Sequence, residues 1–300
     1  MNFINAHLGE FSALLVALFW SISALAFESA SKRLGSLPVN LLRLIIGFIF
    51  LSTLTLFRRG LLFPTDAGWE NWLWLGLSGL VGFVFGDLFL FKSFTIIGSR
   101  FSMLIMTLVP PMTAFFGWII LGERLNSLNL AGMILTFGGI ALAIFSRKNG
   151  TEKLKLKLAP SGIFYALGGS LGQALGLVLS KVGLRDYDPF AATQIRVIFG
   201  IAGFALVVTM FRRWQGVATS LKDRPGMKSL SLGAFFGPFL GVSFSLISVK
   251  FAKTGIASTI MALTPVFILL PSYFLYKQKV TLAELAGAII SVGGVALFFL

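Results

Sequence analysis

Cysteine is absent from the 300-residue sequence, and His7 is its only histidine. Without cysteine the chain has no disulfide, no thiolate nucleophile and no cysteine metal ligand. A single histidine, expected to be an exposed terminal residue, excludes a histidine metal cluster and a nucleophile–histidine–acid triad. The sequence also lacks the Gly-x-x-x-x-Gly-Lys-Ser/Thr loop that holds nucleotide phosphates. We therefore expect no metal, no cofactor and no enzyme activity.

Charged residues are scarce. They make up 12% of the chain and apolar residues 56%, against about 25% and about 45–50% in ordinary globular proteins. Apolar runs of about 20 residues recur along the whole length, and a helix of that size spans the hydrocarbon layer of a membrane. Residues 1–10 contain no Lys or Arg, and no small-residue cleavage site follows, so we expect the first apolar segment to remain as a span. The sequence predicts an all-α integral membrane protein.

Acidic residues are rarer than basic ones, 11 against 25, which gives a net charge of +14. The Lys and Arg residues are scattered over short connections instead of gathering on one face. That distribution favours contact with lipid head groups over nucleic acid. The expected partners are membrane lipid and a small-molecule substrate, without nucleic acid, and we expect a monomer or a homodimer.

Polar residues, proline and glycine divide the chain into ten predicted transmembrane helices. Residues 1–146 hold five, residues 147–160 form a basic interfacial loop, and residues 161–300 hold the other five. The predicted spans are Phe11–Ala30, Val39–Phe57, Trp72–Phe94, Phe101–Leu121, Leu128–Ser146, Gly162–Val182, Phe190–Phe211, Leu230–Lys250, Ile256–Tyr276 and Leu282–Leu300.

The two halves are related by an internal repeat. Sliding the third to fifth spans forward by 155 positions places Gly82 on Gly237, Gly86 on Gly241 and Pro110 on Pro265. Farther upstream the offset changes by a few residues, but Arg43 still aligns with Arg196, and Ser31-Lys32 aligns with Ser180-Lys181. Five spans are an odd number, so the second copy enters the membrane from the opposite side and the repeats are inverted. Inverted repeats recur in secondary transporters, where one half rocks against the other around a central site.

Five motifs follow one another along the chain: Gly86-Asp87-Leu88-Phe89, Ile97-Gly98-Ser99-Arg100, Leu108-Val109-Pro110-Pro111, Leu121-Gly122-Glu123-Arg124-Leu125 and Leu263-Thr264-Pro265. This set resembles the EamA-type transporters of the drug/metabolite transporter superfamily, and the order of the motifs is more telling than any single one. The resemblance implies a ten-helix basket whose fifth and tenth helices brace the outside, and export or exchange of amino acids, other metabolites or drugs. One departure is that Gly122-Glu123-Arg124 corresponds to Lys277-Gln278-Lys279 in the second copy.

Asp87 is the most informative side chain, because a carboxylate inside an apolar helix is unfavourable unless it faces a partner or a wet cavity. Its repeat counterpart is Val242. A carboxylate needed only for the scaffold would be expected in both copies, so the asymmetry favours substrate or proton handling. A buried packing partner remains the alternative.

The basic residues within spans have two interpretations each. Arg43 and Arg196 occur in both copies, which is typical of scaffold, but the planar fork of either could also pair with a substrate carboxylate. Lys92 lies five positions after Asp87, a spacing that favours direct contact less than three or four positions would; it either takes part in coupling or gating of transport or extends to the interface. Glu28 and Lys32 have the i,i+4 spacing of a local ion pair.

Aromatic and amide side chains could line the same site. Trp20 lies in the middle of its span, where it either stacks on a flat apolar ligand or packs. Tyr165, Ser170 and Gln173 on the sixth span could line the opposite wall or form interhelical hydrogen bonds. Pro110 and Pro265 interrupt helices and act either as hinges or as static kinks.

These features favour a secondary transporter or facilitator of small metabolites that works as an exporter. Amino acids, including aromatic ones, are the favoured substrates. A translocator of lipid-linked or nucleotide sugars and a non-transporting receptor or structural subunit are the alternatives. Proton coupling through Asp87 is also open.

Loop charge and the family resemblance disagree about orientation in the cell membrane, for which the bacterial inner membrane is expected. About 7 loop Lys and Arg lie on the side that shares both termini and about 15 on the other, so the positive-inside rule places the termini outside. The resemblance implies cytoplasmic termini. Because two long loops carry most of the difference, we predict cytoplasmic termini.

Overall fold

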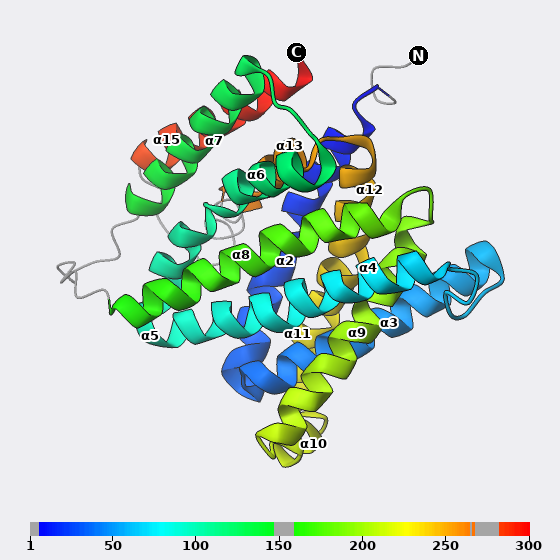
Figure 1. Ribbon diagram of the computed structural model, residues 1–300. Coiled ribbons are helices and arrows are strands. Elements are labelled where there is room, and N and C mark those ends of the chain that lie inside the picture. The colour runs from blue at the N-terminus through cyan, green and yellow to red at the C-terminus, as the bar shows by residue number, and fades with distance from the viewer. Residues whose placement is uncertain (1–5, 147–158, 265, 268–281) are drawn as a thin grey trace.

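The computed structural model describes residues 6–146, 159–264, 266–267 and 282–300. Over these ranges the chain forms helices joined by short connections and contains no strand (Figure 1). Most of the predicted 147–160 loop, together with Pro265 and Gln278, lies outside the described residues.

The helices of the first half follow the predicted spans closely, apart from one connection. The π-helical segment η1 (Leu80–Gly86) joins two of them. They are α2 (Leu8–Leu34), α3 (Ser36–Arg59), α4 (Trp69–Gly79), α5 (Asp87–Met106), α6 (Val109–Leu121) and α7 (Ser127–Ser146).

The second half contains a second π-helical segment, η2 (Phe235–Gly241), and ends in the short 3-10 helix η3 (Leu297–Phe299). Its other helices are α8 (Pro160–Leu184), α9 (Pro189–Met210), α10 (Trp214–Ser220), α11 (Arg224–Ala234), α12 (Val242–Phe251), α13 (Thr254–Met261) and α15 (Leu282–Ala296).

Seven helical stretches within the described ranges are long and apolar enough to cross a membrane, and the shorter apolar helices Val109–Leu121 and Ser127–Leu142 accompany them. Their ends follow local rules. Asp188 caps α9, because its side chain accepts hydrogen bonds from the N–H groups of Phe190 and Ala191 at 3.1 and 3.0 Å. At the C-terminal end of α3, Gly60 adopts the left-handed backbone conformation, which glycine reaches without strain. The prediction of an all-α, multi-pass membrane protein is confirmed.

One predicted connection is wrong. We expected a break between Phe94 and Phe101, but α5 continues through this stretch to Met106. The break comes at Thr107 and Leu108, just before Pro110, because a proline fits the first turn of a helix and not its interior. Pro110 therefore lies in the first turn of α6 and does not kink the middle of a span.

The two π-helical segments occupy the same position in the two halves. Leu80–Gly86 and Phe235–Gly241 are 155 residues apart, the same offset as the sequence repeat. In η2, Pro238 removes one backbone donor and so disrupts the ordinary hydrogen-bond ladder. A π-helical turn leaves the backbone locally wide, and such turns often occur at functional sites.

The main body of the molecule is built from crossing helices of both halves. The helix α2 packs against α11, η2 and α12, while α8 packs against α4, η1 and α5. The helix α3 of the first half packs against α9 of the second half, and the larger hydrophobic core lies around these two helices. Figure 1 shows α8 running alongside α4 and α5 across the front of the molecule. Each half therefore contributes helices to the packing of the other.

The helices α7 and α15 form a separate pair at one edge (Figure 1). Their contact is made of small residues: a Cβ on Gly139 would lie 2.5 Å from the backbone nitrogen of Ser291, and a Cβ on Gly294 would lie 2.6 Å from that of Thr136. Small residues let two backbones approach closely where lipid surrounds them. These are the predicted fifth and tenth spans.

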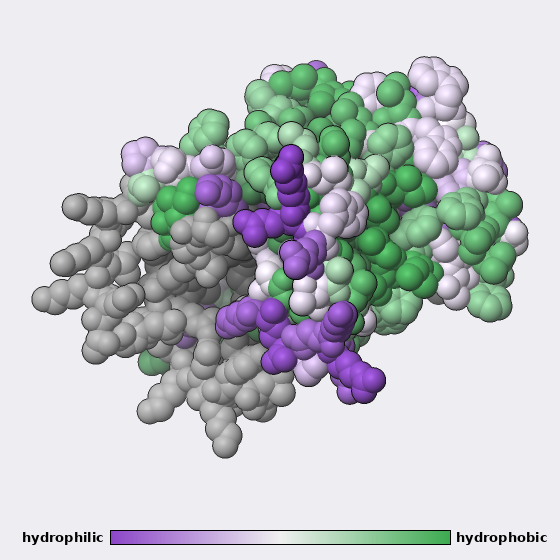
Figure 2. All heavy atoms as spheres, turned by 90° about the horizontal axis from the view of Figure 1, so that it is seen from below, coloured by the Kyte–Doolittle hydropathy of each residue, from purple (hydrophilic) through white to green (hydrophobic). Residues whose placement is uncertain are grey.

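The outer surface carries many large apolar side chains, including Phe57, 84% exposed, and Ile134, 70% exposed. Such exposure suits a lipid environment. Figure 2 shows hydrophilic side chains gathered at the end seen from below, where α10 lies in Figure 1. Exposed basic residues near α10 include Arg212, Arg213 and Lys222.

Candidate functional site

Asp87 lies where η1 ends and α5 begins, and it is 6% exposed. Its carboxylate forms an ion pair with Arg43 of α3. The side-chain nitrogen of Gln173 on α8 donates to the carboxylate at 3.0 Å and to the carbonyl oxygen of Gly82 at 3.3 Å. Three predicted candidates thus meet at one point, supplied by three spans and by both halves. We call Arg43, Asp87 and Gln173 the central triad.

The central triad explains how a carboxylate is tolerated inside an apolar helix. An isolated buried charge costs several kcal/mol, whereas a paired and hydrogen-bonded one is stabilised. Arg43 also lies over the ring of Phe27, with its guanidinium carbon 5.5 Å from the ring centroid. Arg43 Nε, however, is buried without a hydrogen-bond partner among the described residues. The group is therefore paired in charge but retains an unused donor.

Arg196 lies on α9 and is 5% exposed. Its guanidinium carbon is 5.0 Å from the ring centroid of Phe83, and its Nη2 atom lies 3.4 Å from the position that a Cβ on Gly82 would take. The Arg196 carbonyl packs directly on Gly79, where a Cβ would collide with it. Its Nε atom is buried without a partner, and no described residue forms a hydrogen bond or an ion pair with the side chain. The repeat counterpart of Arg43 thus has no counter-ion in the described part of the chain.

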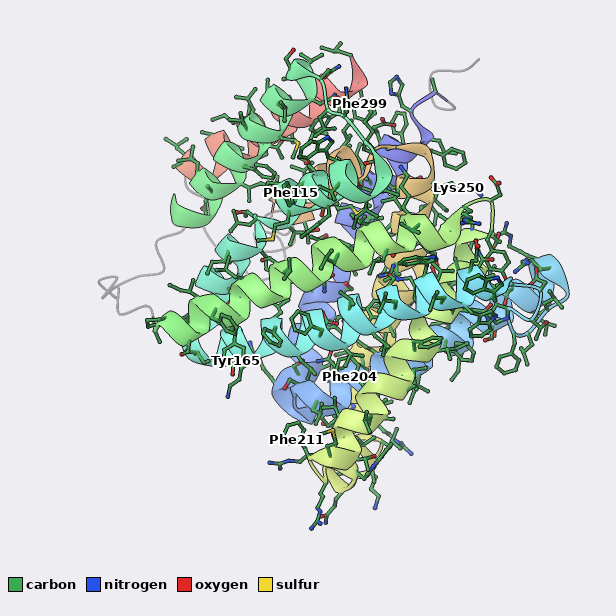
Figure 3. All side chains as sticks on the ribbon, in the orientation of Figure 1. Phe115, Tyr165, Phe204, Phe211, Lys250 and Phe299 are labelled. Atoms are coloured by element: carbon green, nitrogen blue, oxygen red, sulfur yellow. The ribbon has the colours of Figure 1, made fainter. Side chains whose placement is uncertain are left out.

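Trp20 and Tyr165 pack against η2 and α5, and neither forms a hydrogen bond with the central triad among the described residues. A Cβ on Gly241 would lie 2.5 Å from the indole nitrogen of Trp20, so this side chain rests on η2. Tyr165 packs edge-on against Phe89 of α5, with ring centroids 5.4 Å apart. It precedes Gln173 by eight residues, or about 12 Å along the helix axis. Figure 3 shows it near the N-terminal end of α8, beside α5.

The predicted gating residues have separate positions. Lys92 is exposed on α5, and Pro110 is buried in the first turn of α6. Pro265 lies outside the described residues, but Ala262 and Leu263 before it form a turn at the positions equivalent to Thr107 and Leu108. Ser170 donates to the carbonyl of Ile105 at 3.2 Å, an interhelical hydrogen bond.

A second polar group, not among the predicted site residues, links the two halves at one end. Lys181 Nζ of α8 lies 2.7 Å from Glu123 Oε1, just after α6, and donates to the carbonyl of Ala252 at 2.7 Å. Glu123 Oε2 accepts from the backbone N–H and the hydroxyl of Thr254, both at 2.7 Å, and so stabilises the start of α13. Both residues stand in motifs already noted: the Gly122-Glu123-Arg124 sequence and the repeated Ser-Lys pair.

The EamA-like transporter family model matches residues 7–145 and 160–300. The chain belongs to this family. Family membership places it among membrane transporters and confirms the resemblance found in the sequence.

Two curated relatives carry the same kind of description. An uncharacterized transporter of Synechocystis sp. is 26% identical over 262 residues, which cover 79% of this chain and 77% of that protein. An uncharacterized transporter of Archaeoglobus fulgidus is 25% identical over 287 residues, covering 94% of both chains. Neither description includes a substrate.

A solved crystal structure of another protein supports the fold. It superposes with a TM-score of 0.71 over 98% of this chain and 96% of that one, at 20% sequence identity. Helical packing of this kind therefore exists in an experimentally determined protein.

Proposed function

We propose that this protein is a secondary transporter or facilitator that exports small metabolites, with amino acids, including aromatic ones, as the favoured substrates. Ten transmembrane helices would form two inverted five-helix repeats, at residues 1–146 and 161–300. Rocking of one repeat against the other would open a central site to each side of the membrane in turn.

One observation carries this proposal: the central triad. Its charged and amide groups come from α3, the start of α5 and α8, so helices of both halves meet at Asp87. Buried polar residues within membrane helices typically mark substrate or ion pathways. The π-helical segment η1 ends directly before Asp87, and its repeat equivalent η2 packs against α3, the helix that carries Arg43. Local departures from α-helix often accompany transporter binding sites.

Counterflow in proteoliposomes tests the proposal. Vesicles are preloaded with single unlabelled amino acids, and uptake of labelled tryptophan and threonine is followed with wild type and Asp87→Asn. We expect saturable exchange that is selective among solutes and is lost in Asp87→Asn. Asp186→Asn, at an exposed carboxylate between α8 and α9, is the matched control and should keep exchange.

Absence of exchange with folded wild-type protein would refute the amino-acid assignment. Exchange of lipid-linked or nucleotide sugars in the same vesicles would instead identify a sugar translocator. Exchange that Asp87→Asn leaves unchanged would leave transport standing and remove the central triad from the mechanism.

A further inference from the structure

The charges of Arg43, Asp87 and Arg196 do not cancel. Arg43 and Asp87 form an ion pair and neutralise each other. Arg196 adds one positive charge, is 5% exposed, and has no hydrogen-bond or ion-pair partner among the described residues. Together these three side chains therefore carry one excess positive charge.

An ionised arginine inside a membrane protein without a counter-ion is unfavourable, because the low-dielectric surroundings do not replace its hydration. The ring of Phe83 offers a cation–π contact at 5.0 Å, which leaves the N–H donors of the guanidinium unused. Five N–H donors in a planar fork match the two oxygens of a carboxylate or of a phosphate group. A carboxylate or a phosphate group would therefore supply the counter-ion that Arg196 lacks among the described residues.

The position of Arg196 connects it with the central triad. Its Nη2 atom lies beside Gly82, whose carbonyl accepts the hydrogen bond from Gln173. Gln173 also donates to Asp87, so one side chain joins Gly82 to the paired charges. A Cβ on Gly82 would lie 3.4 Å from Nη2 and 3.5 Å from the Cα of Gly176, so the lack of a side chain lets η1 pack closely against both Arg196 and α8.

The repeat shows why the two arginines differ. Arg43 pairs with Asp87, whereas the residue at the Asp87 position of the second copy is Val242. The second copy keeps the arginine and lacks the carboxylate. An arginine needed only for packing would be expected to keep its internal partner as well.

We propose that Arg196 binds the ionised acid group, a carboxylate or a phosphate, of the transported solute. This inference rests on the proposed transport function and specifies the class of substrate. The Arg43–Asp87 pair then contributes fixed polar groups, and Arg196 contributes the charge that selects acids.

Binding to the purified full-length protein in detergent tests the inference without requiring flux. The probes are matched pairs with and without the acid group: L-phenylalanine against L-phenylalaninamide, and glycerol 3-phosphate against glycerol, with inorganic phosphate added. Saturable stabilisation against thermal unfolding is measured at constant ionic strength. We expect only acid members to bind, and the two pairs distinguish carboxylate from phosphate.

Variants then locate the binding group. Arg196→Gln should weaken binding of the acid probe at least tenfold, and Arg196→Lys should retain part of it because the charge remains without the planar fork. The matched control is Arg213→Gln, which removes an exposed arginine and should bind as wild type does. If Arg196→Gln does not fold, the difference in binding between the acid and amide probes on the wild-type protein still tests whether the site selects acids.

Two results would overturn the inference: no acid probe binds to folded wild-type protein, or an acid probe binds equally well to Arg196→Gln. Either can occur while counterflow of an uncharged solute shows that the protein transports. Conversely, acid binding that depends on Arg196 without counterflow of the same acid would refute transport of that acid and leave the anion site standing.

Discussion

Arg43, Asp87 and Gln173 determine the polar chemistry at the scale of single residues. Each is supplied by a different span, and together they pair one carboxylate with a guanidinium and an amide donor. Such a group is stable only while it is complete, because removing one partner leaves a buried charge uncompensated.

Arg43→Gln should destabilise the protein by about 3–5 kcal/mol, because the Asp87 carboxylate loses its counter-ion while it stays buried. The double variant with Asp87→Asn should be more stable than Arg43→Gln alone. Thermal unfolding in detergent of both single variants and the double variant gives the coupling between the two residues. Strictly additive losses would show that the pair is not coupled.

Sequence reasoning identified these residues better than it identified their contacts. Asp87 stood out because a carboxylate within an apolar run needs an explanation, and Gln173 because its amide lies in the sixth span. The pairing with Arg43 did not follow from spacing, since the two residues are 44 positions apart on different helices. The Lys181–Glu123 pair, separated by 58 positions, was missed for the same reason.

At the scale of helices, glycine positions decide how closely elements approach. On α7 two adjacent glycines have opposite surroundings: a Cβ on Gly139 would meet the backbone of α15, whereas a Cβ on Gly138 would have nothing within 4 Å. Adjacent residues of a helix point in different directions, so only one of them can face the partner helix.

Gly139→Ala should therefore lower stability by about 1–3 kcal/mol, because the added methyl group forces the two backbones apart. Gly138→Ala is the matched control and should be neutral or stabilising by up to about 1 kcal/mol, since alanine is the better helix former. Unfolding midpoints of the two variants in the same detergent measure the difference. Equal midpoints would indicate that α7 and α15 do not pack through this face.

Helix boundaries followed from the sequence where apolar runs meet proline or glycine. The predicted span Val39–Phe57 lies inside α3, and Phe190–Phe211 nearly coincides with α9. The break expected before Phe101 was predicted from the stretch Gly98-Ser99-Arg100. This stretch remains helical within α5, so the prediction was wrong. In the second copy a break does occur, at Ala252 and Lys253, where Glu123 stabilises the helix start at Thr254. Local composition alone could not distinguish the two cases.

At the scale of the whole molecule, Glu123 of the first half forms polar contacts with residues of the second half. It accepts hydrogen bonds from α13 and pairs with Lys181 of α8, while its repeat counterpart is the uncharged Gln278. The second copy therefore has no carboxylate at the position equivalent to Glu123.

Substitutions at Glu123 should separate these contacts. Glu123→Gln loses the ion pair but keeps an oxygen for Thr254, and Glu123→Ala loses both, at about 1–3 kcal/mol for each charged hydrogen bond. Hydrogen exchange at the start of α13 should accordingly be slowest in wild type, faster in Glu123→Gln and fastest in Glu123→Ala. Unchanged exchange in Glu123→Ala would refute the link.

Membrane orientation is a second property of the whole molecule. We predict cytoplasmic termini, so a green fluorescent protein fused after Leu300 should fluoresce in bacteria and an alkaline phosphatase fusion should be inactive. The reverse pattern would show that the basic loops, including the exposed Arg212, Arg213 and Lys222, determine the orientation by the positive-inside rule.

The uncompensated charge of Arg196 has a consequence for transport driven by membrane voltage. For a solute of charge −1, the loaded site would be neutral and the empty site would carry one positive charge. Voltage acts on a moving charge with about 2.3 kcal/mol per 100 mV. One-for-one exchange, which uses only the loaded site, would then proceed at the same rate at any membrane potential, whereas net export, which must return the empty site, would respond to it.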